Sequence, residues 1–173
     1  GNWLVYHKDI GAGNYLVLNT TAGVTAGSFA WNSTDPTNDV YSIGAGYTNG
    51  NDYIAYCFAD TDGYCKAGKW VGNGSIDGPM VFTGFRPSLV LTKRDGTSWW
   101  GISDSKRSPF NEVANTLAAN ENYSESVLTS DMNVDFLSNG FKIRDTSAYY
   151  NASGGTYIFL AFAETPLKFA TAR

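Results

Sequence analysis

The 173-residue chain is poor in the residue types on which most catalytic sites depend. It has one histidine, His7, and two cysteines, Cys57 and Cys65. A Ser-His-Asp or Cys-His device needs its histidine beside a nucleophile, and no elbow-type serine motif accompanies His7. We therefore interpret His7 as a partly exposed histidine on a strand, not as a catalytic base.

Charged residues and long apolar runs are also scarce. The formal net charge is −4, whereas a nucleic-acid partner held through its phosphates requires a basic face. No apolar run approaches the roughly 20 residues that cross a bilayer, so we expect neither nucleic-acid binding nor membrane insertion. The chain opens without methionine or a signal peptide, and we expect Gly1 not to be the first residue of the natural protein.

The cysteines and acids offer no complete metal site. Cys57 and Cys65 lie eight residues apart around a predicted turn, so they either pair across a hairpin or stay reduced, and we favour reduced thiols. Residues 60–63 (DTDG) hold only a fragment of a calcium loop, and residues 72–74 (GNG) lack the rest of a phosphate loop. We expect no metal and no cofactor.

Glycine and aromatic residues are abundant instead, with 19 Gly, 11 Tyr, 10 Phe and 5 Trp, as is typical of an all-β chain with many turns. Only residues 109–120 have any helical tendency. An antiparallel β-sandwich or jelly roll is the predicted fold, with hairpins at Asp95-Gly96 and Asn139-Gly140, where Asn-Gly suits a positive φ. Short strands are predicted at residues 3–8, 15–19, 40–44, 53–60, 68–74, 82–93, 100–106, 116–120 and 157–164, and on both sides of the turn within residues 134–143.

Two stretches share one pattern. Residues 53–60 (YIAYCFAD) return as residues 157–164 (YIFLAFAE), and each is an apolar run closing on an acid, typical of a strand buried on both faces. Three further landmarks recur in the same order, so we infer internal repeats. Residues 1–67 form a partial first repeat that lacks its opening strands, and residues 68–173 form a complete second one. The first repeat must then be completed by the second repeat, a neighbouring chain or another segment.

The acidic residues do not form a convincing glycosidase pair, which needs two carboxylates at controlled spacing. Asp60 and Asp62 alternate along a predicted strand, but Pro166 stands at the place of the second acid in the other copy. Glu121 and Glu125 lie in a polar loop. We predict that Asp60 and Asp62 charge the sheet edge and that the chain is not an enzyme. Glycan cleavage is the third hypothesis.

Aromatic residues beside amides stand in several predicted loops. Sugars stack their apolar ring faces on aromatic planes while amides and acids bind the hydroxyls. Loop aromatics also cover sheet edges and make subunit contacts, so both interpretations stay open. The candidate glycan contacts are Trp31, Asn32, Tyr47, Tyr123, Tyr149, Tyr150 and Asn151.

Several phrases together resemble the lectin-like repeats of tailed-phage tail fibres and other virion proteins: residues 83–94 (TGFRPSLVLTKR), 69–74 (KWVGNG), 104–107 (DSKR), 136–141 (FLSNGF) and 151–157 (NASGGTY). The resemblance implies a concanavalin A-like β-sandwich on a virion that assembles in the host bacterial cytoplasm. Tail fibres are usually trimeric, so it also implies a homotrimer. The chain's ending is similar to how such proteins terminate.

The leading hypothesis is therefore a receptor-binding module of a phage virion, in a tail fibre or associated with the tail, that recognises host-surface glycans non-covalently. The alternative is a structural virion subunit, for decoration or fibre formation, whose aromatic residues contact other virion proteins.

Overall fold

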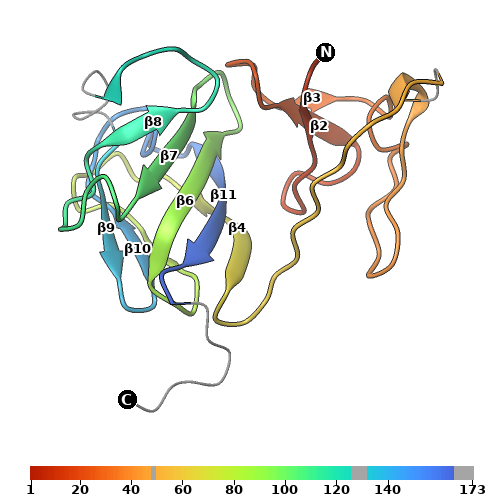
Figure 1. Cartoon of the computed structure of the whole chain (residues 1–173). Coiled ribbons are helices and arrows are strands. Elements are labelled where there is room, and N and C mark those ends of the chain that lie inside the picture. Colours follow the sequence, from red (N-terminus) through yellow and green to blue (C-terminus); the bar gives the residue numbers. More distant parts are fainter. Residues whose placement is uncertain (48–49, 126–131, 166–173) are drawn as a thin grey trace.

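The computed structural model describes residues 1–47, 50–125 and 132–165 and has an almost entirely β architecture. Across these ranges there is no α-helix, and η1 (Ala45–Tyr47) is a short 3-10 turn. The strands form an N-terminal lobe and a C-terminal lobe, joined by an extended linker at residues 50–64 (Figure 1). All pairings are antiparallel, which confirms the predicted class.

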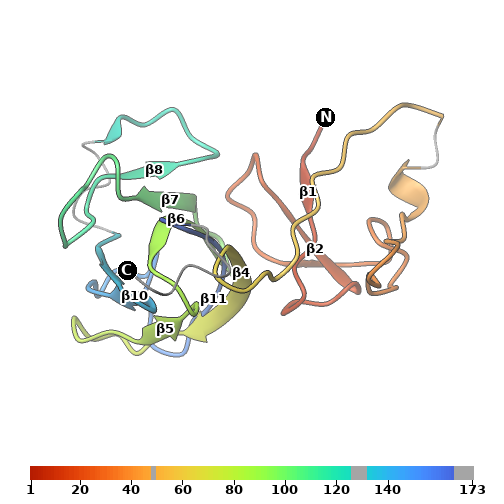
Figure 2. The same cartoon turned by 60° about the horizontal axis from the view of Figure 1, so that its bottom comes forward.

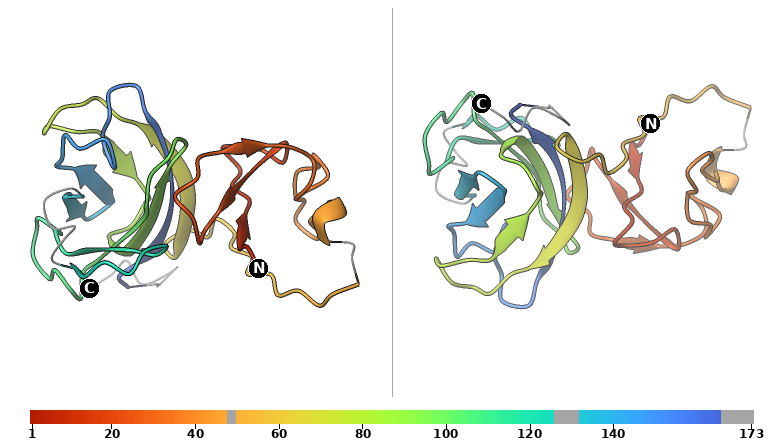
Figure 3. Two further views of the ribbon diagram at one scale, coloured as in Figure 1. Left: turned by 90° about the horizontal axis from the view of Figure 1, so that it is seen from above. Right: turned by 90° about the horizontal axis from the view of Figure 1, so that it is seen from below.

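The C-terminal lobe consists of two sheets packed face to face (Figure 3). The larger sheet has the order β4 (Cys65–Val71), β11 (Thr156–Ala163), β6 (Pro87–Arg94), β7 (Trp100–Asp104) and β8 (Thr116–Ala118). The smaller sheet has the order β5 (Met80–Phe82), β10 (Gly140–Ile143) and β9 (Val134–Leu137). This arrangement is sandwich-like.

Aromatic residues fill the space between the two sheets. Trp70 stacks on Tyr157 with ring centroids 5.0 Å apart, and Phe141 meets both Trp70 and Phe159 edge to face. Full burial of a large apolar side chain stabilises a fold by roughly 1.5–3 kcal/mol. These rings therefore make the C-terminal lobe the stable part of the molecule.

Strand β11 occupies the centre of the larger sheet, between β4 and β6. Tyr157, Phe159 and Ala161 point into the sandwich core, whereas Ile158 points to the other side and joins a second cluster with Leu16 and Trp100. Both faces of β11 are thus covered, so the prediction of a strand buried on both faces is confirmed for the apolar run 157–163, and Glu164 after it is exposed.

The N-terminal lobe is a small sheet of β1 (Leu4–Val5), β2 (Asn14–Val17) and β3 (Thr25–Ala26) that packs against the outer face of the larger sheet (Figure 2). Leu16 is fully buried beside Trp100 and Ile158. The indole N–H of Trp100 donates to the carbonyl oxygen of Val17 at 3.0 Å. The N-terminal lobe therefore depends on the C-terminal lobe for most of its apolar burial.

The prediction of a strand buried on both faces is wrong for residues 53–60. They form no strand, and every residue from 51 to 60 is exposed, with Ile54 at 77% and Tyr56 at 69%. Their sequence suits a central strand, but no neighbouring strand lies on either edge among the described residues. Residues 40–44 likewise form no strand and residues 109–120 no helical turn.

Both predicted hairpins are confirmed, since β6 pairs with β7 around residues 95–99 and β9 pairs with β10 around Ser138 and Asn139. The reason given for Gly140 is wrong, because neither Asn139 nor Gly140 has a positive φ. A Cβ on Gly140 would lie 2.0 Å from the carbonyl oxygen of Val81. Glycine is required there because β5 approaches β10 closely.

The hairpins β1–β2 and β7–β8 have the same geometry. Leu4 pairs with Val17 and Val5 with Leu16, as Gly101 pairs with Ala118 and Ile102 with Leu117. Asn19 Oδ1 accepts from the backbone N–H of Trp3 at 2.9 Å, and Asn120 Oδ1 accepts from that of Trp100 at 2.8 Å. The carbonyl oxygens of Trp3 and Trp100 each accept a backbone hydrogen bond at 2.8 Å, from Leu18 and Ala119.

Candidate functional site

Three aromatic residues of the C-terminal lobe gather at one end of the larger sheet, and we call Trp99, Tyr123 and Tyr149 the C-terminal aromatic cluster. Trp99 and Tyr149 stack with ring centroids 4.1 Å apart and planes 9° from parallel. Tyr123 meets Trp99 edge to face at 5.6 Å and is 44% exposed. The cluster thus presents aromatic surface on a rigid support.

The sheet fixes Trp99 in place. Ser98 donates its backbone N–H to the carbonyl oxygen of Thr21 at 3.0 Å, and β7 begins at the buried Trp100. Adjacent strand residues point to opposite faces, and because Trp100 faces the N-terminal lobe, Trp99 faces the sandwich side, where it is partly buried against the core. Tyr149 is positioned by Ser147, whose Oγ accepts its backbone N–H at 3.2 Å. Sequence reasoning placed Trp99 among the loop aromatic residues but chose only Tyr123 and Tyr149 as contacts, and the stacking of Trp99 on Tyr149 adds it to the cluster.

Four aromatic residues form an N-terminal aromatic cluster: Tyr6, Trp31, Tyr47 and Tyr53. Trp31 stacks on Tyr47 with ring centroids 6.4 Å apart, and Tyr53 meets Tyr47 edge to face at 4.8 Å. Tyr6 meets Trp31 edge to face, and its hydroxyl donates to Asp35 Oδ1 at 3.3 Å. Partial burial and the Asp35 carboxylate raise the pKa of Tyr6 above its ordinary value.

The predicted contact Asn32 is exposed beside Trp31 and has a φ of 52°, a conformation that asparagine tolerates better than most residues. The structure therefore brings Trp31, Asn32 and Tyr47 together in one lobe, and Tyr123 and Tyr149 in the other.

Tyr150 and Asn151 are corrected from surface contacts to core residues. Tyr150 is 1% exposed, its hydroxyl lies 3.1 Å from Ser103 Oγ, and burial raises its pKa. Asn151 is fully buried, and its amide nitrogen, with two hydrogens to donate, lies 2.6 Å from the carbonyl oxygen of Ser75, 2.8 Å from that of Asp145 and 3.0 Å from Asn73 Oδ1. The side-chain amide of Asn151 thus connects the loop at residues 73–75 to the loop at residue 145. Neither side chain is available to a ligand at the surface.

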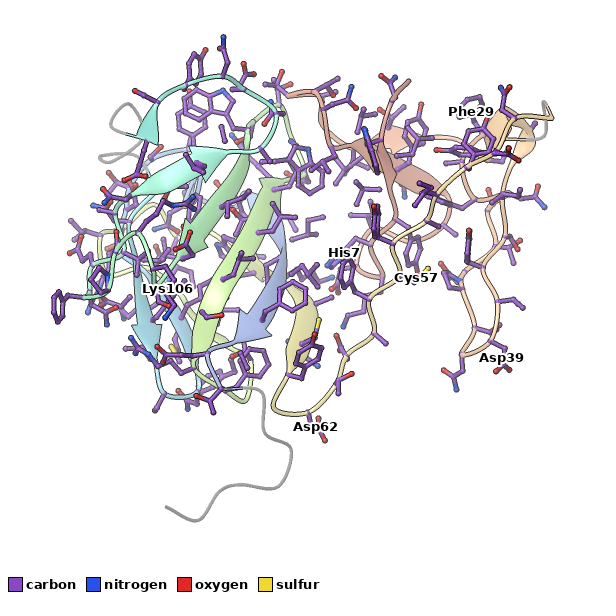
Figure 4. The ribbon with its side chains drawn as sticks, in the orientation of Figure 1. His7, Phe29, Asp39, Cys57, Asp62 and Lys106 are labelled. Carbon is purple, nitrogen blue, oxygen red and sulfur yellow. The ribbon has the colours of Figure 1, made fainter. Side chains whose placement is uncertain are left out.

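His7 is also corrected, because it is only 8% exposed and lies after β1 between the two lobes (Figure 4). Its Nδ1 accepts from the backbone N–H of Asp9, so its Nε2–H donates to the carbonyl oxygen of Phe159 at 3.2 Å. Burial lowers the pKa of His7, which favours the neutral ring. His7 therefore ties the N-terminal lobe to β11.

Asp60 charges the edge of the larger sheet, as predicted, whereas Asp62 is exposed in the turn before β4. One oxygen accepts from the backbone N–H of Ala67 in β4 at 2.8 Å, and the other lies 2.7 Å from Lys66 Nζ and 3.5 Å from Lys8 Nζ. Burial alone would raise the pKa of Asp60, but these partners outweigh burial and lower it. A carboxylate held ionised in this way is unsuited to act as a general acid.

A groove of about 300 Å³ follows this edge, between β4 and β5, and its charges are paired. Lys69 Nζ lies 3.5 Å from Asp9, as Lys66 lies beside Asp60. Across residues 1–47, 50–125 and 132–165, no group of three or more His, Cys, Asp or Glu side chains is arranged to hold a metal ion.

Both cysteines are free thiols. Cys65 is buried, and burial raises its pKa, so it packs as a small apolar residue. Cys57 is exposed on the linker, so it does not pack in the core (Figure 4).

In the described part of the chain no helix is long and apolar enough to span a membrane. No curated protein and no solved structure matches the chain. One family model, described as a domain of unknown function (DUF7483), matches residues 1–166 and so covers both lobes. The chain belongs to this DUF7483 family.

Proposed function

We propose that the chain is a receptor-binding module of a phage virion and that it binds a host-surface glycan non-covalently at the C-terminal aromatic cluster. The observation that carries this proposal is the stacked pair Trp99–Tyr149 with Tyr123 beside it. The resemblance of residues 68–173 to lectin-like repeats of virion proteins supports the biological setting.

The chemistry of the cluster suits a sugar better than a charged or metal-bound ligand. The exposed ring of the cluster, Tyr123, can stack on the C–H side of a pyranose ring, which buries apolar area without a charge. Glu121 and Asn122 precede Tyr123 in the same loop, and Asn122 is exposed. An amide and a carboxylate next to an aromatic plane supply the hydrogen bonds that a sugar's hydroxyl groups need.

Glycan binding by the Tyr123→Ala variant tests the proposal. We expect wild-type protein to bind host-surface polysaccharide on an array and the variant to bind roughly tenfold more weakly, as loss of one stacking ring predicts. Tyr41→Ala is the matched control, because Tyr41 is 45% exposed and lies outside both clusters. Equal binding by all three proteins, or none by wild type, would contradict the proposal.

We further propose that the two hairpins β1–β2 and β7–β8 belong to two copies of one repeat and that the C-terminal lobe is a concanavalin A-like sandwich. The identical strand register and the two equivalent Trp–Asn hydrogen bonds support the duplication.

A structural virion subunit is the second candidate function, and the exposed apolar linker favours it. Soluble proteins rarely leave contiguous large apolar side chains in water without an interaction to make. Imaging of the assembled particle distinguishes the two functions. A linker buried against another subunit supports the structural function, whereas an aromatic cluster facing outward supports receptor binding.

A further inference from the structure

The turn between β6 and β7, residues 95–99, lies against the N-terminal lobe. Val24 donates its backbone N–H to the carbonyl oxygen of Asp95 at 2.7 Å. Ser98 donates its backbone N–H to the carbonyl oxygen of Thr21 at 3.0 Å. We call residues 21–24, which lie between β2 and β3, the β2–β3 loop, and Figure 1 shows it beside the β6–β7 turn. Two main-chain hydrogen bonds therefore join the two lobes at this turn.

Gly23 shows how closely the β2–β3 loop and the turn fit together. A Cβ on Gly23 would lie 2.6 Å from the carbonyl oxygen of Asp95 and 3.0 Å from the carbonyl carbon of Gly96. Glycine is used where two main-chain segments approach this closely, because it has no Cβ to clash. Any larger residue at position 23 must therefore push the β2–β3 loop away from the turn.

Lys93 supports the same turn from within the molecule. Its side chain is 1% exposed, and its Nζ donates to the carbonyl oxygens of Arg94 at 2.9 Å and of Gly96 at 2.8 Å. A buried charge is costly unless it is hydrogen-bonded, and these two carbonyl oxygens provide the partners. Lys93 and the β2–β3 loop together hold the turn in one position.

The residue that this turn positions is Trp99. It follows Ser98 and precedes Trp100, and both neighbours donate hydrogen bonds to carbonyl oxygens of the N-terminal lobe. The ring centroid of Trp99 lies 4.1 Å from that of Tyr149 and 5.6 Å from that of Tyr123. A shift of the turn therefore moves the ring against which Tyr123, the exposed residue of the C-terminal aromatic cluster, is packed.

We propose that the N-terminal lobe regulates the glycan site, because the β2–β3 loop holds the β6–β7 turn and so sets the affinity of the C-terminal aromatic cluster. This inference rests on the proposed function and adds a second element, distant from the sugar, to the same site. Coupling between two sites is reciprocal, so a bound glycan should also strengthen the contact between the β2–β3 loop and the turn.

Gly23→Ala tests the proposal, with Gly13→Ala as its matched control. Both substitutions add one methyl group to a glycine of the N-terminal lobe, but a Cβ on Gly13 would meet nothing beyond its chain neighbours within 4 Å. We expect Gly23→Ala to bind host-surface polysaccharide roughly fivefold or more weakly than wild type, the lower end of typical coupling, and Gly13→Ala to bind as wild type does. In a Tyr123→Ala background, Gly23→Ala should have little further effect, because both changes act through the same cluster.

Amide hydrogen exchange measures the contact between the lobes directly and needs no variant. The backbone N–H groups of Val24 and Ser98 make the two hydrogen bonds at the turn. The control is the backbone N–H of Leu18, which donates to Trp3 within the N-terminal lobe. We expect saturating polysaccharide to slow exchange at Val24 and Ser98 roughly fivefold or more and to leave Leu18 unchanged. In Gly23→Ala without polysaccharide, Val24 and Ser98 should exchange faster than in wild type.

The outcomes separate this inference from the proposed function. Equal polysaccharide binding by Gly23→Ala and wild type would overturn the inference and leave the proposed function standing. Exchange at Val24 and Ser98 that does not respond to bound polysaccharide would do the same. Absence of binding by wild type would overturn both. If Gly23→Ala does not fold, the exchange experiment on wild type decides whether the two elements are coupled.

Discussion

The two copies of one sequence pattern adopt different structures. In the C-terminal lobe, β11 is flanked by β4 and β6 and is covered on both faces. In the N-terminal lobe, residues 54–58 repeat its pattern but stand in solvent. An apolar alternating pattern thus specifies what a segment is able to pair with, while the neighbouring strands decide whether it is buried.

The largest expected difference is in the loss of stability when isoleucine is replaced by alanine at two equivalent positions, 158 and 54. Ile158→Ala should lower the free energy of unfolding by roughly 2–5 kcal/mol, because Ile158 is 3% exposed and packs against Leu16 and Trp100. Ile54→Ala should change it by about 0.5 kcal/mol or less, because Ile54 is 77% exposed. Urea denaturation of both variants measures the difference. Equal losses would mean that the linker is packed in solution.

Removal of the equivalent Trp–Asn hydrogen bonds should give a smaller difference in stability. Asn120→Ala should cost about 1 kcal/mol, because it leaves the backbone N–H of Trp100 without its partner beside a buried ring. Asn19→Ala should cost less, since Asn19 is exposed and water replaces it. Thermal unfolding of the two variants tests this order. Asp at either position keeps the accepting oxygen and should restore part of the loss, and failure to do so would argue against the bond.

The smallest effect concerns the junction between the lobes and depends on pH. Burial lowers the folded-state pKa of His7 below its ordinary value of 6.5, so the unfolded chain binds a proton more readily. The contribution of His7 is therefore fully present above pH 6.5 and is lost as the pH falls from 6.5 toward the folded-state pKa. Asp9 and Asp60 oppose this shift and Lys8 adds to it.

A His7→Gln variant isolates that contribution. Its amide donates to Phe159 in place of the ring but does not titrate, so it should lose less stability than wild type between about pH 7.5 and about pH 5.5. Chemical denaturation at both pH values provides the comparison. Identical pH dependence of the two proteins would show that His7 does not titrate in this range.

Much of the C-terminal lobe could be predicted from the sequence, because local signals and long-range pairing agree there. The run at residues 157–164, the Asp95-Gly96 turn and the hairpin around Asn139 all lie where predicted. The prediction of a buried strand at residues 53–60 failed for a physical reason. Their pattern is that of β11, and no sequence pattern reports that neighbouring strands are absent.

The candidate site was predictable only in part. Tyr123 and Tyr149 follow from their polar loops, whereas Trp99 joins them only through the fold, which stacks it on Tyr149. Tyr150 and Asn151 have the same local composition as a surface loop, and only the fold shows that they tie residues 73–75 and 145 to the core. Composition identifies residues able to bind a sugar, but burial selects among them.

The late place of β11 in the chain also orders events during synthesis. β4 and β6 have no contact through the sheet until residues 156–163 have been made, and His7 must wait for Phe159, 152 residues later. Contacts so distant in sequence slow folding. While the ribosome works through the intervening residues, the apolar faces of β4, β6 and β7 lie open together. The nascent chain therefore passes through an interval of high aggregation risk, which ends only when β11 has been synthesised.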